Sequence, residues 1–167
     1  MNVIVKNMEE DTEFQGKAYV HYKSWHESYS EIVDSEYLEN KITYEKCLSM
    51  AVKYPDNTLV AKEGERVVGF AAYGAYRDGS LSRCGEVYAI YVLEEFQKRG
   101  IGRALMDAAL DKLKEYDKVA LWVLKDNAKA IGFYKKYGFR PDGAESVISL
   151  GNELAEIRMI FERNGKE

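Results

Sequence analysis

A glycine-containing loop places the strongest constraint on the fold of this chain. It reads Gln-Lys-Arg-Gly-Ile-Gly-Arg-Ala over Gln97–Ala104, after a strand-like apolar run, Val87–Leu93, and at the start of a helix-like run, Ile101–Leu113. Gly100 and Gly102 let backbone N–H groups come close to a ligand, and a helix N-terminus carries about half a positive charge. The order strand, glycine loop, helix therefore predicts a cradle for an anionic group such as a pyrophosphate.

The spacing of this loop separates it from two better-known phosphate-binding loops. A dinucleotide site has Gly-x-Gly-x-x-Gly, and a nucleotide P-loop has Gly-x4-Gly-Lys-Ser/Thr. Here Gly102 is followed by Arg-Ala-Leu-Met over residues 103–106. Neither pattern fits, so the loop is expected to bind another kind of anionic ligand.

Two segments resemble the GNAT family of N-acetyltransferases, in particular its small bacterial-type members. Gln97, Gly100 and Gly102 match the family's acyl-CoA signature Gln/Arg-x-x-Gly-x-Gly/Ala. Asn127–Phe139 is similar to the family's block Asn-x-x-Ala-x-x-Phe-Tyr-x-x-x-Gly-Phe, and the strand-like run Val119–Leu124 lies between the two. On two matches in the right order, the chain is identified as a member of this family.

Hydrophobic periodicity and turn residues predict the remaining elements. Strands are expected at Val3–Lys6, Thr58–Lys62, Arg66–Tyr76, Ser146–Leu150 and Glu156–Phe161, and helices at Asp11–Trp25 and Ser35–Met50. The resemblance implies their assembly into an α/β (α+β) GNAT fold. In that fold a single mixed, mostly antiparallel sheet of about seven strands, flanked by about four helices, splays open at strands 4 and 5.

Length and composition favour one globular domain over residues 1–167. No apolar run approaches the roughly 20 residues that span a bilayer, and no signal peptide is evident, so a cytoplasmic protein without membrane contact is expected. Cys47 and Cys84 stand alone, and the chain has only two histidines. Reduced structural cysteines and no metal site are therefore expected.

Charge is distributed unevenly along the chain. Residues 1–50 hold ten Asp or Glu against five Lys, whereas residues 51–167 hold eighteen acids against nineteen Lys or Arg. Nucleic-acid-binding proteins usually carry a basic stripe, so no nucleic-acid partner is expected. An acidic face suits a cationic acceptor, although the same acids are also typical of solvated helix surface.

The resemblance implies acetyl-CoA as cofactor, held by the glycine loop, by the fourth strand and by the segment after Asn127. The expected binding residues are Ile90, Tyr91, Val92, Gln97, Lys98, Arg99, Gly100, Ile101, Gly102, Arg103, Ala104, Asn127, Ala130, Phe133 and Tyr134. By family analogy, backbone groups of residues 90–92 run along the pantetheine arm, and an N–H near Val92 faces the thioester oxygen. The basic side chains of the loop pair with phosphates or are simply solvated.

Some of these residues also have local structural interpretations. Asn127 suits a helix N-cap, worth about 1 kcal/mol, and Gly138 suits a left-handed helix C-cap. For Tyr134 the family role is acid or hydrogen-bond donor to the leaving thiolate. The alternative for Tyr134 is membership of an apolar helical stripe with Phe133 and Tyr137.

The acceptor amine must lose a proton before it can attack. An alkylammonium of pKa about 10.4 is disfavoured as free amine by about 4.6 kcal/mol at pH 7. Glu86, at the start of the fourth strand, is the preferred base because many family members carry Glu there. The alternatives are Tyr88 or Glu27 as base, and Glu86 as an exposed strand-start charge.

Trp25-His26-Glu27-Ser28-Tyr29 resembles a Trp-x-x-x-Tyr segment that forms the acceptor wall in related enzymes. Trp25 and Tyr29 are expected to box an alkylammonium by cation–π contact, with Glu27 or Glu31 supplying charge and Tyr88 as a further substrate-binding residue. The alternative is core aromatics plus surface acids.

The resulting functional hypothesis is acetyl transfer to a small cationic amine such as a polyamine. Acetylation of protein N-termini or lysines, and acyl-CoA binding without turnover, stay open. The resemblance also allows for a homodimer.

Overall fold

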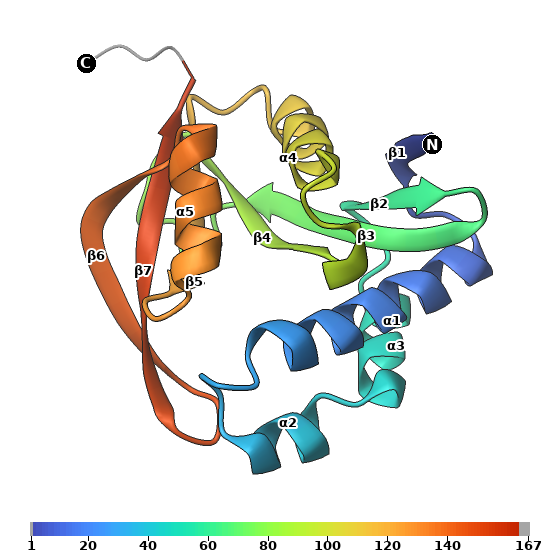
Figure 1. The fold of residues 1–167 in the computed structure, drawn as a ribbon. Coiled ribbons are helices and arrows are strands. Elements are labelled where there is room, and N and C mark those ends of the chain that lie inside the picture. The colour runs from blue at the N-terminus through green and yellow to red at the C-terminus, as the bar shows by residue number, and fades with distance from the viewer. Residues whose placement is uncertain (1, 164–167) are drawn as a thin grey trace.

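The computed structural model describes residues 2–163. The chain forms five α-helices, one short 3₁₀ helix and seven strands within this range (Figure 1). In order, these are β1 Val3–Asn7, α1 Asp11–Ser28, α2 Ser35–Lys41, α3 Tyr44–Lys53, β2 Thr58–Glu63, β3 Arg66–Ala75, β4 Cys84–Val92, η1 Glu94–Phe96, α4 Ile101–Lys112, β5 Lys118–Leu124, α5 Ala128–Tyr137, β6 Arg140–Ser149 and β7 Glu153–Glu162.

All seven strands belong to one sheet of order β1-β2-β3-β4-β5-β7-β6. Neighbouring strands run antiparallel except β4 and β5, which are parallel. The helix α4 supplies the crossover that a parallel pair requires. The predicted fold, a mixed and mostly antiparallel sheet of seven strands, is confirmed.

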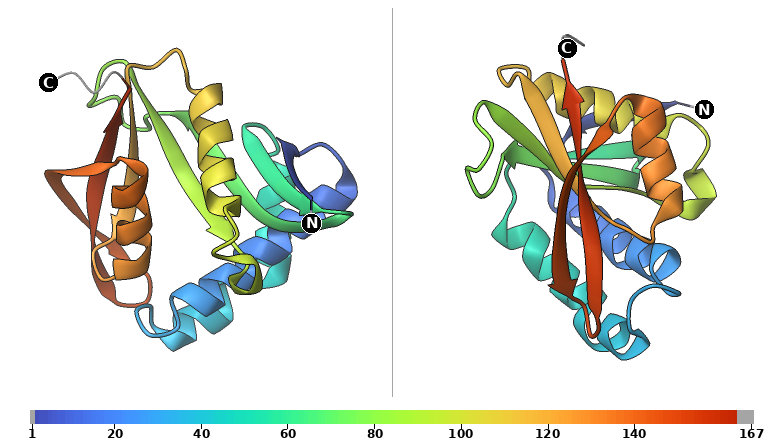
Figure 2. Two further views of the ribbon diagram at one scale, coloured as in Figure 1. Left: turned by 45° about the horizontal axis from the view of Figure 1, so that its top comes forward. Right: turned by 90° about the vertical axis from the view of Figure 1, so that its left-hand side faces the viewer.

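Helices cover both faces of the sheet (Figure 2). On one face, α1 packs against β3 and β4 and against α3. On the other face, α4 packs against β1 to β4, and α5 lies beside it, so that Phe133 of α5 faces the Gly102 position of α4. The core between these layers holds fully buried side chains such as Phe70, Leu105 and Met159.

The two parallel strands separate after a short contact, as predicted. β4 and β5 pair only at Cys84–Glu86 with Lys118–Ala120. β4 continues to Val92 alongside β3, but on its other side no described strand accompanies residues 87–92. The unpaired backbone edge of β4 therefore faces the gap that opens towards β5.

The single helix predicted over Ser35–Met50 is wrong. The structure has two helices, α2 and α3, separated at Ile42 and Thr43. Thr43 has an extended backbone, and its hydroxyl accepts a hydrogen bond from the N–H of Lys46 at 3.2 Å. Thr43 is thus the N-cap that starts a new helix. The apolar periodicity continues across this break, so periodicity alone predicted one helix.

The last two strands are longer than predicted. β6 begins at Arg140 and contains an irregularity between Pro141 and Glu145, while β7 begins at Glu153. Gly151, in the turn between them, has a φ of +85°. Most of β6 is exposed, which explains why hydrophobic patterning missed its first half.

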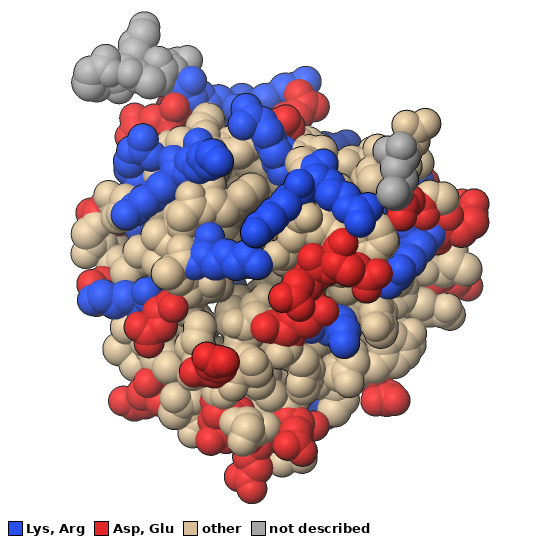
Figure 3. Space-filling view, viewed as in Figure 1, with Lys and Arg blue, Asp and Glu red and all other residues tan. Residues whose placement is uncertain are grey.

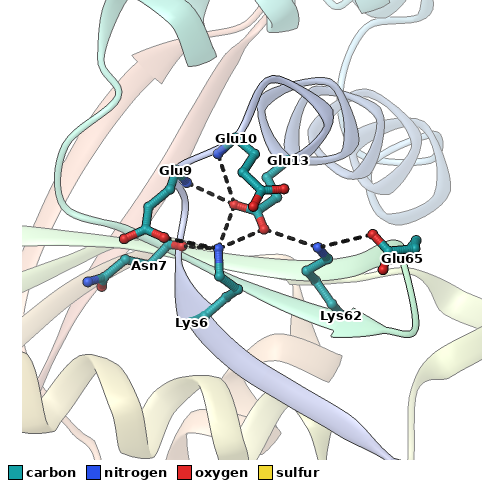
Figure 4. Close-up of polar contacts among 7 residues, drawn as sticks. All are labelled: Lys6, Asn7, Glu9, Glu10, Glu13, Lys62 and Glu65. Atoms are coloured by element: carbon teal, nitrogen blue, oxygen red, sulfur yellow. Dashed lines mark hydrogen bonds and ion pairs between the residues drawn. The ribbon is translucent and has the colours of Figure 1, made fainter.

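A buried charge cluster anchors the start of α1 to the sheet (Figure 4). The carboxylate of Glu13, which is fully buried, accepts hydrogen bonds from Lys6 Nζ at 2.7 Å and Lys62 Nζ at 3.0 Å. It also accepts from the backbone N–H groups of Glu9 and Glu10 at 2.8 and 3.1 Å. Burial alone would raise the pKa of Glu13, but these hydrogen bonds outweigh it and lower the pKa to about 2.

The described residues bear on the expectations for membrane-spanning helices, metal sites and cysteines. Across residues 2–163, no helix is long and apolar enough to cross a membrane. In the same range, His, Cys, Asp and Glu do not gather in a group that could hold a metal ion. Cys47 and Cys84 are both buried free thiols.

Candidate active site

A cavity of about 670 Å³ lies where β4 and β5 separate. Most of the residues predicted as site residues line it, although they come from four distant parts of the chain. These are Trp25, Glu27, Tyr29, Tyr88, Ile90, Tyr91, Val92, Gln97, Lys98, Gly100, Gly102, Arg103, Asn127, Ala130, Phe133 and Tyr134. Glu86, Arg99, Ile101 and Ala104 are not part of its wall.

The glycine loop forms one end of the cavity through its backbone. Gly100 has a φ of +82° and is the N-cap of α4, and Lys98 also has a positive φ, of 65°. The first hydrogen bond of the helix runs from the N–H of Ala104 to the carbonyl of Gly100 at 3.0 Å. The N–H groups of residues 101–103 therefore have no partner within the helix and suit an anionic ligand. The side chain of Ile101 is buried in the core, so that residue contributes only its backbone.

Basic side chains surround this end of the cavity. Lys98, Arg103, Lys129 and Lys136 all line it. In the space-filling view, Lys and Arg gather over the upper half of the face that carries α4 and α5, whereas Asp and Glu dominate the lower half (Figure 3). The basic upper half suits phosphate groups, and the acidic lower half suits a cation.

Gln97 connects three elements at the glycine loop. Its side-chain amide donates to the carbonyl of Val92 at 2.9 Å, and its amide oxygen accepts from Lys129 Nζ at 2.6 Å. The signature glutamine thus ties the loop to the end of β4 and to the first turn of α5.

The helix α5 places Tyr134 on the cavity wall. Asn127 caps the helix, since its Oδ1 accepts from the N–H of Ala130 at 3.2 Å, and Gly138 ends it with a positive φ. Both predicted caps are confirmed. Burial raises the pKa of Tyr134, and the neighbouring Tyr29 adds to the rise. The phenol of Tyr134 therefore stays protonated at any physiological pH and is a donor.

Three tyrosines meet in the middle of the cavity. The hydroxyls of Tyr29 and Tyr91 are hydrogen-bonded at 3.0 Å, and Trp25 packs edge-on against Tyr29 with ring centroids 4.8 Å apart. Burial raises the pKa of Tyr91, with contributions from Tyr29 and Tyr134. Trp25 and Tyr29 both line the cavity, and Tyr29 is also a buried member of a small core cluster.

Glu86 is not an exposed charge at the start of a strand, and that alternative is wrong. Its side chain is 1% exposed and is held by Arg77, whose Nη2 and Nε donate at 2.7 and 3.2 Å and whose backbone N–H donates at 3.2 Å. The carboxylate therefore points at Arg77, and it is Arg77 that lines the cavity.

The two alternative bases are engaged as well. The carboxylate of Glu27 accepts the backbone N–H of Glu94 at 3.1 Å, which ties the end of α1 to η1. The hydroxyl of Tyr88 donates to the carbonyl of Ala75. Each group therefore already has a structural partner.

Several cavity residues have no signal in the sequence. They include Arg77, Trp122, Ile148, Leu150 and Glu156. Arg77 lies in a polar loop, and the last three belong to the exposed β6–β7 hairpin and its turn. The alternation of residues along β7 assigns its side chains to two faces of the strand. It does not say which of these faces is the inner one.

The β6–β7 hairpin lines the end of the cavity opposite the glycine loop. Its turn reaches α2, as Figure 1 shows, and the side-chain oxygen of Asn152 accepts the N–H of Asp34 at 3.1 Å. Gly151 lies so close to Asp34 and Tyr37 that an added Cβ would fall 2.7 Å from the Cβ of Asp34. Ile148, Leu150 and Leu154 pack against the cluster around Tyr29.

Comparison with known sequences identifies relatives over most of the chain. A family model described as the acetyltransferase (GNAT) family matches residues 18–139. The uncharacterized N-acetyltransferase YuaI of Bacillus subtilis is 34% identical over 149 residues, which cover 85% of this chain and 80% of YuaI.

Solved structures show the same fold. The PaiA N-acetyltransferase of Thermoplasma acidophilum, in complex with coenzyme A, superposes with a TM-score of 0.73 at 23% identity, over 98% of this chain and all of that chain. PH1933 of Pyrococcus horikoshii superposes with a TM-score of 0.72 at 23% identity, over 98% of this chain and 99% of that chain.

Proposed function

The chain belongs to the GNAT family and is an N-acetyltransferase that uses acetyl-CoA, and we propose that its acceptor is a small cationic amine such as a polyamine. The acetyl group passes by direct attack of the amine nitrogen on the thioester carbon. The observation that carries this proposal is the contact between the β6–β7 hairpin and α2 at the acceptor end. This contact limits the room for an extended peptide backbone, whereas a small molecule needs no such groove.

The acceptor end also has suitable surroundings for a cation. Its walls include Trp25, Tyr29 and Trp122, and its charged residues include Glu156. Aromatic faces attract an ammonium group by about 0.5–2 kcal/mol, more when it is desolvated. The acidic lower half of the surface in Figure 3 favours the approach of cations.

The other end of the cavity suits the cofactor. The free N–H groups of residues 101–103 and the basic side chains around them would hold the pyrophosphate. The pantetheine arm would lie along the unpaired edge of β4 over residues 90–92. An N–H near Val92 would face the thioester oxygen, a kind of donor worth about 3–4 kcal/mol in the transition state.

A bulky side chain at position 102 should weaken acetyl-CoA binding. A Cβ at Gly102 would lie 3.3 Å from the ring of Phe133, in the gap between α4 and α5 that the cavity occupies. The branches of valine in Gly102→Val must then displace Phe133. A displaced Phe133 takes cavity space that the cofactor needs, so we expect the Kd to rise about 10-fold or more, which corresponds to about 1.4 kcal/mol. Isothermal titration calorimetry with acetyl-CoA measures this change.

The matched control is Gly132→Ala. Gly132 lies in α5, and an added Cβ there meets no atom within 4 Å. This variant should bind acetyl-CoA like the wild type. Wild-type affinity in Gly102→Val would place the cofactor elsewhere.

Tyr134 is the proposed donor to the leaving thiolate. It lines the cavity, and its phenol is protonated at neutral pH. A phenol of raised pKa transfers its proton less readily, so its main contribution is a hydrogen bond to the sulfur as negative charge develops. Glu86 would act through Arg77, whose guanidinium it holds at the cavity wall.

The experiment that tests the proposal is thiol release from acetyl-CoA with a panel of polyamines, other small amines, amino acids, aminoglycosides and short peptides. Release that depends on small cationic amines is the expected result. Release with peptides alone would assign a protein acceptor. Absence of thiol release with every acceptor, together with tight acetyl-CoA binding, would favour a regulator without turnover.

The proposal also includes a cytoplasmic location, in keeping with two free thiols. The proposed protein is a monomer or a homodimer, and light scattering would distinguish the two.

A further inference from the structure

We propose that Glu156 binds the ammonium group of the acceptor and removes its proton. This inference rests on the proposed function, because it concerns the same cavity and the same reaction. It assigns the proton-accepting role to a residue of β7 that no sequence motif indicates. Glu86, Glu27 and Tyr88, the residues that the sequence suggested for this role, each have a structural partner instead.

The position of Glu156 is set by strand register. In the sheet it lies opposite Leu124 of β5 on one side and opposite Ser146 of β6 on the other. Its partly exposed side chain lines the cavity together with Leu124 and Ile148. Glu156 thus stands in the cavity wall at the acceptor end, which the hairpin lines.

Glu156 is free to take a ligand. Among residues 2–163, its carboxylate forms no hydrogen bond and no salt bridge. Of the other two acids in the cavity wall, Glu27 is bonded to the backbone of η1, and Glu94 is an exposed residue of η1 next to the glycine loop. Glu156 is therefore the acid that the acceptor end offers to an incoming cation.

Charged groups around Glu156 tune its basicity. Burial raises its pKa; the positive charge of Arg77, from the loop between β3 and β4, opposes this rise, and Glu86 on β4 adds to it. Glu86 neutralises much of the charge of Arg77 through their salt bridge. Tyr29, from the end of α1, also faces Glu156.

The remaining neighbours add little. Arg158, two residues along β7, is occupied by Asp142 and by the hydroxyl of Tyr76. Leu124 and Ser146, the sheet neighbours, do not titrate. A carboxylate with a raised pKa is a stronger base. A bound cation stabilises the ionised form of the carboxylate, which burial alone disfavours.

Tyr29 links Glu156 to the place of reaction. Burial raises the pKa of Tyr29, and the charge of Glu156 contributes to the rise. Tyr29 is hydrogen-bonded to Tyr91, and both tyrosines line the same cavity as Glu156 and Tyr134. An amine held at Glu156 therefore lies in the cavity that Tyr134 and residues 90–92 of β4 also line.

The proton inventory of the reaction then balances. Glu156 takes the first proton from the alkylammonium, which frees the nitrogen lone pair. The nitrogen forms a bond to the acetyl carbon, and the carbon–sulfur bond breaks with its electron pair on sulfur. The thiolate accepts a hydrogen bond from Tyr134 and takes the proton that the nitrogen loses as the amide forms. The proton on Glu156 leaves to solvent, so one proton is released for each acetyl group transferred.

Glu156→Gln tests this role, with n-butylamine and spermidine as probes. Calorimetry measures binding of each amine to the complex with CoA, and thiol release measures kcat/KM between pH 6 and 10. At pH 7 we expect at least 10-fold weaker amine binding and about 100-fold lower kcat/KM. The difference in kcat/KM between the variant and the wild type should shrink as the pH approaches 10, because free amine then forms without help from a base on the protein. Acetyl-CoA affinity should be unchanged.

Two further variants complete the test. Glu153→Gln removes an exposed carboxylate from the same strand and should behave like the wild type. Glu156→Asp keeps an ionisable group and should restore part of the activity with the wild-type pH profile. Wild-type amine affinity and pH profile in Glu156→Gln would overturn the inference, as would absence of amine binding to the wild type. Amine binding that depends on Glu156, without thiol release by the wild type, would support the ammonium site and refute the proposed function.

Discussion

Tyr134→Phe is expected to lower kcat by about 10²- to 10⁴-fold while the Kd for acetyl-CoA stays nearly unchanged. The substitution removes only a hydroxyl, and the ring keeps its contacts with Phe133 and Phe139. The loss therefore isolates donation to the leaving thiolate. Stopped-flow thiol release, with cofactor binding measured separately by calorimetry, gives both quantities.

The pH profile provides a second check on Tyr134. Because burial raises its pKa, the phenol does not titrate between pH 6 and 9. Any basic limb of the rate profile in that range should therefore persist in Tyr134→Phe. The matched control is Tyr137→Phe, one turn along α5, whose hydroxyl donates to Asp107 outside the cavity. An unchanged kcat in Tyr134→Phe would contradict the assigned role.

Glu13→Gln is expected to lower the free energy of unfolding by about 3–5 kcal/mol, because it leaves the buried ammonium of Lys62 without its partner. The lost carboxylate also joins α1 to β1 and β2 (Figure 4). Urea unfolding at pH 7 measures the change. The control Glu65→Gln removes an exposed carboxylate at 3.9 Å from the same lysine and should leave the stability essentially unchanged.

The same cluster predicts how stability depends on pH. The folded protein lowers the pKa of Glu13 from 4.5 to about 2. Its contribution to stability is therefore complete above pH 4.5 and is lost as the pH falls from 4.5 towards 2. The difference in unfolding free energy between the wild type and Glu13→Gln should shrink over that range. A constant difference would mean that the lost stability comes from packing and not from the charge.

The separation of β4 and β5, which opens the site, has a simple physical origin. A cavity opens because β4 and β5 pair over only three residues on each strand, so the unpaired edge of β4 and the wall of β5 and β7 face each other. Residues of α1 and α5 complete the cavity wall. Side chains encoded more than 100 residues apart, from Trp25 to Glu156, thus line one cavity.

The sequence alone determined those parts of the protein that depend on local interactions. The glycine loop, the N-cap at Asn127 and the positive φ at Gly138 all follow from residues within a few positions of one another, and the structure confirms them. Local chemistry also contained the break at Thr43, but hydrophobic periodicity concealed it. Family motifs then supplied the assembly, which periodicity does not encode.

Tertiary structure alone decided which charged groups are available for chemistry. Glu86 and Glu156 are indistinguishable as isolated glutamates in strands, yet Arg77 engages one of them and strand register brings the other into the cavity wall. Register between β5 and β7 depends on packing between residues more than 30 positions apart, and the position of the β6–β7 turn depends on its contact with the start of α2. These contacts form only when the whole sheet assembles, because a strand's own alternation does not say which of its faces will be buried.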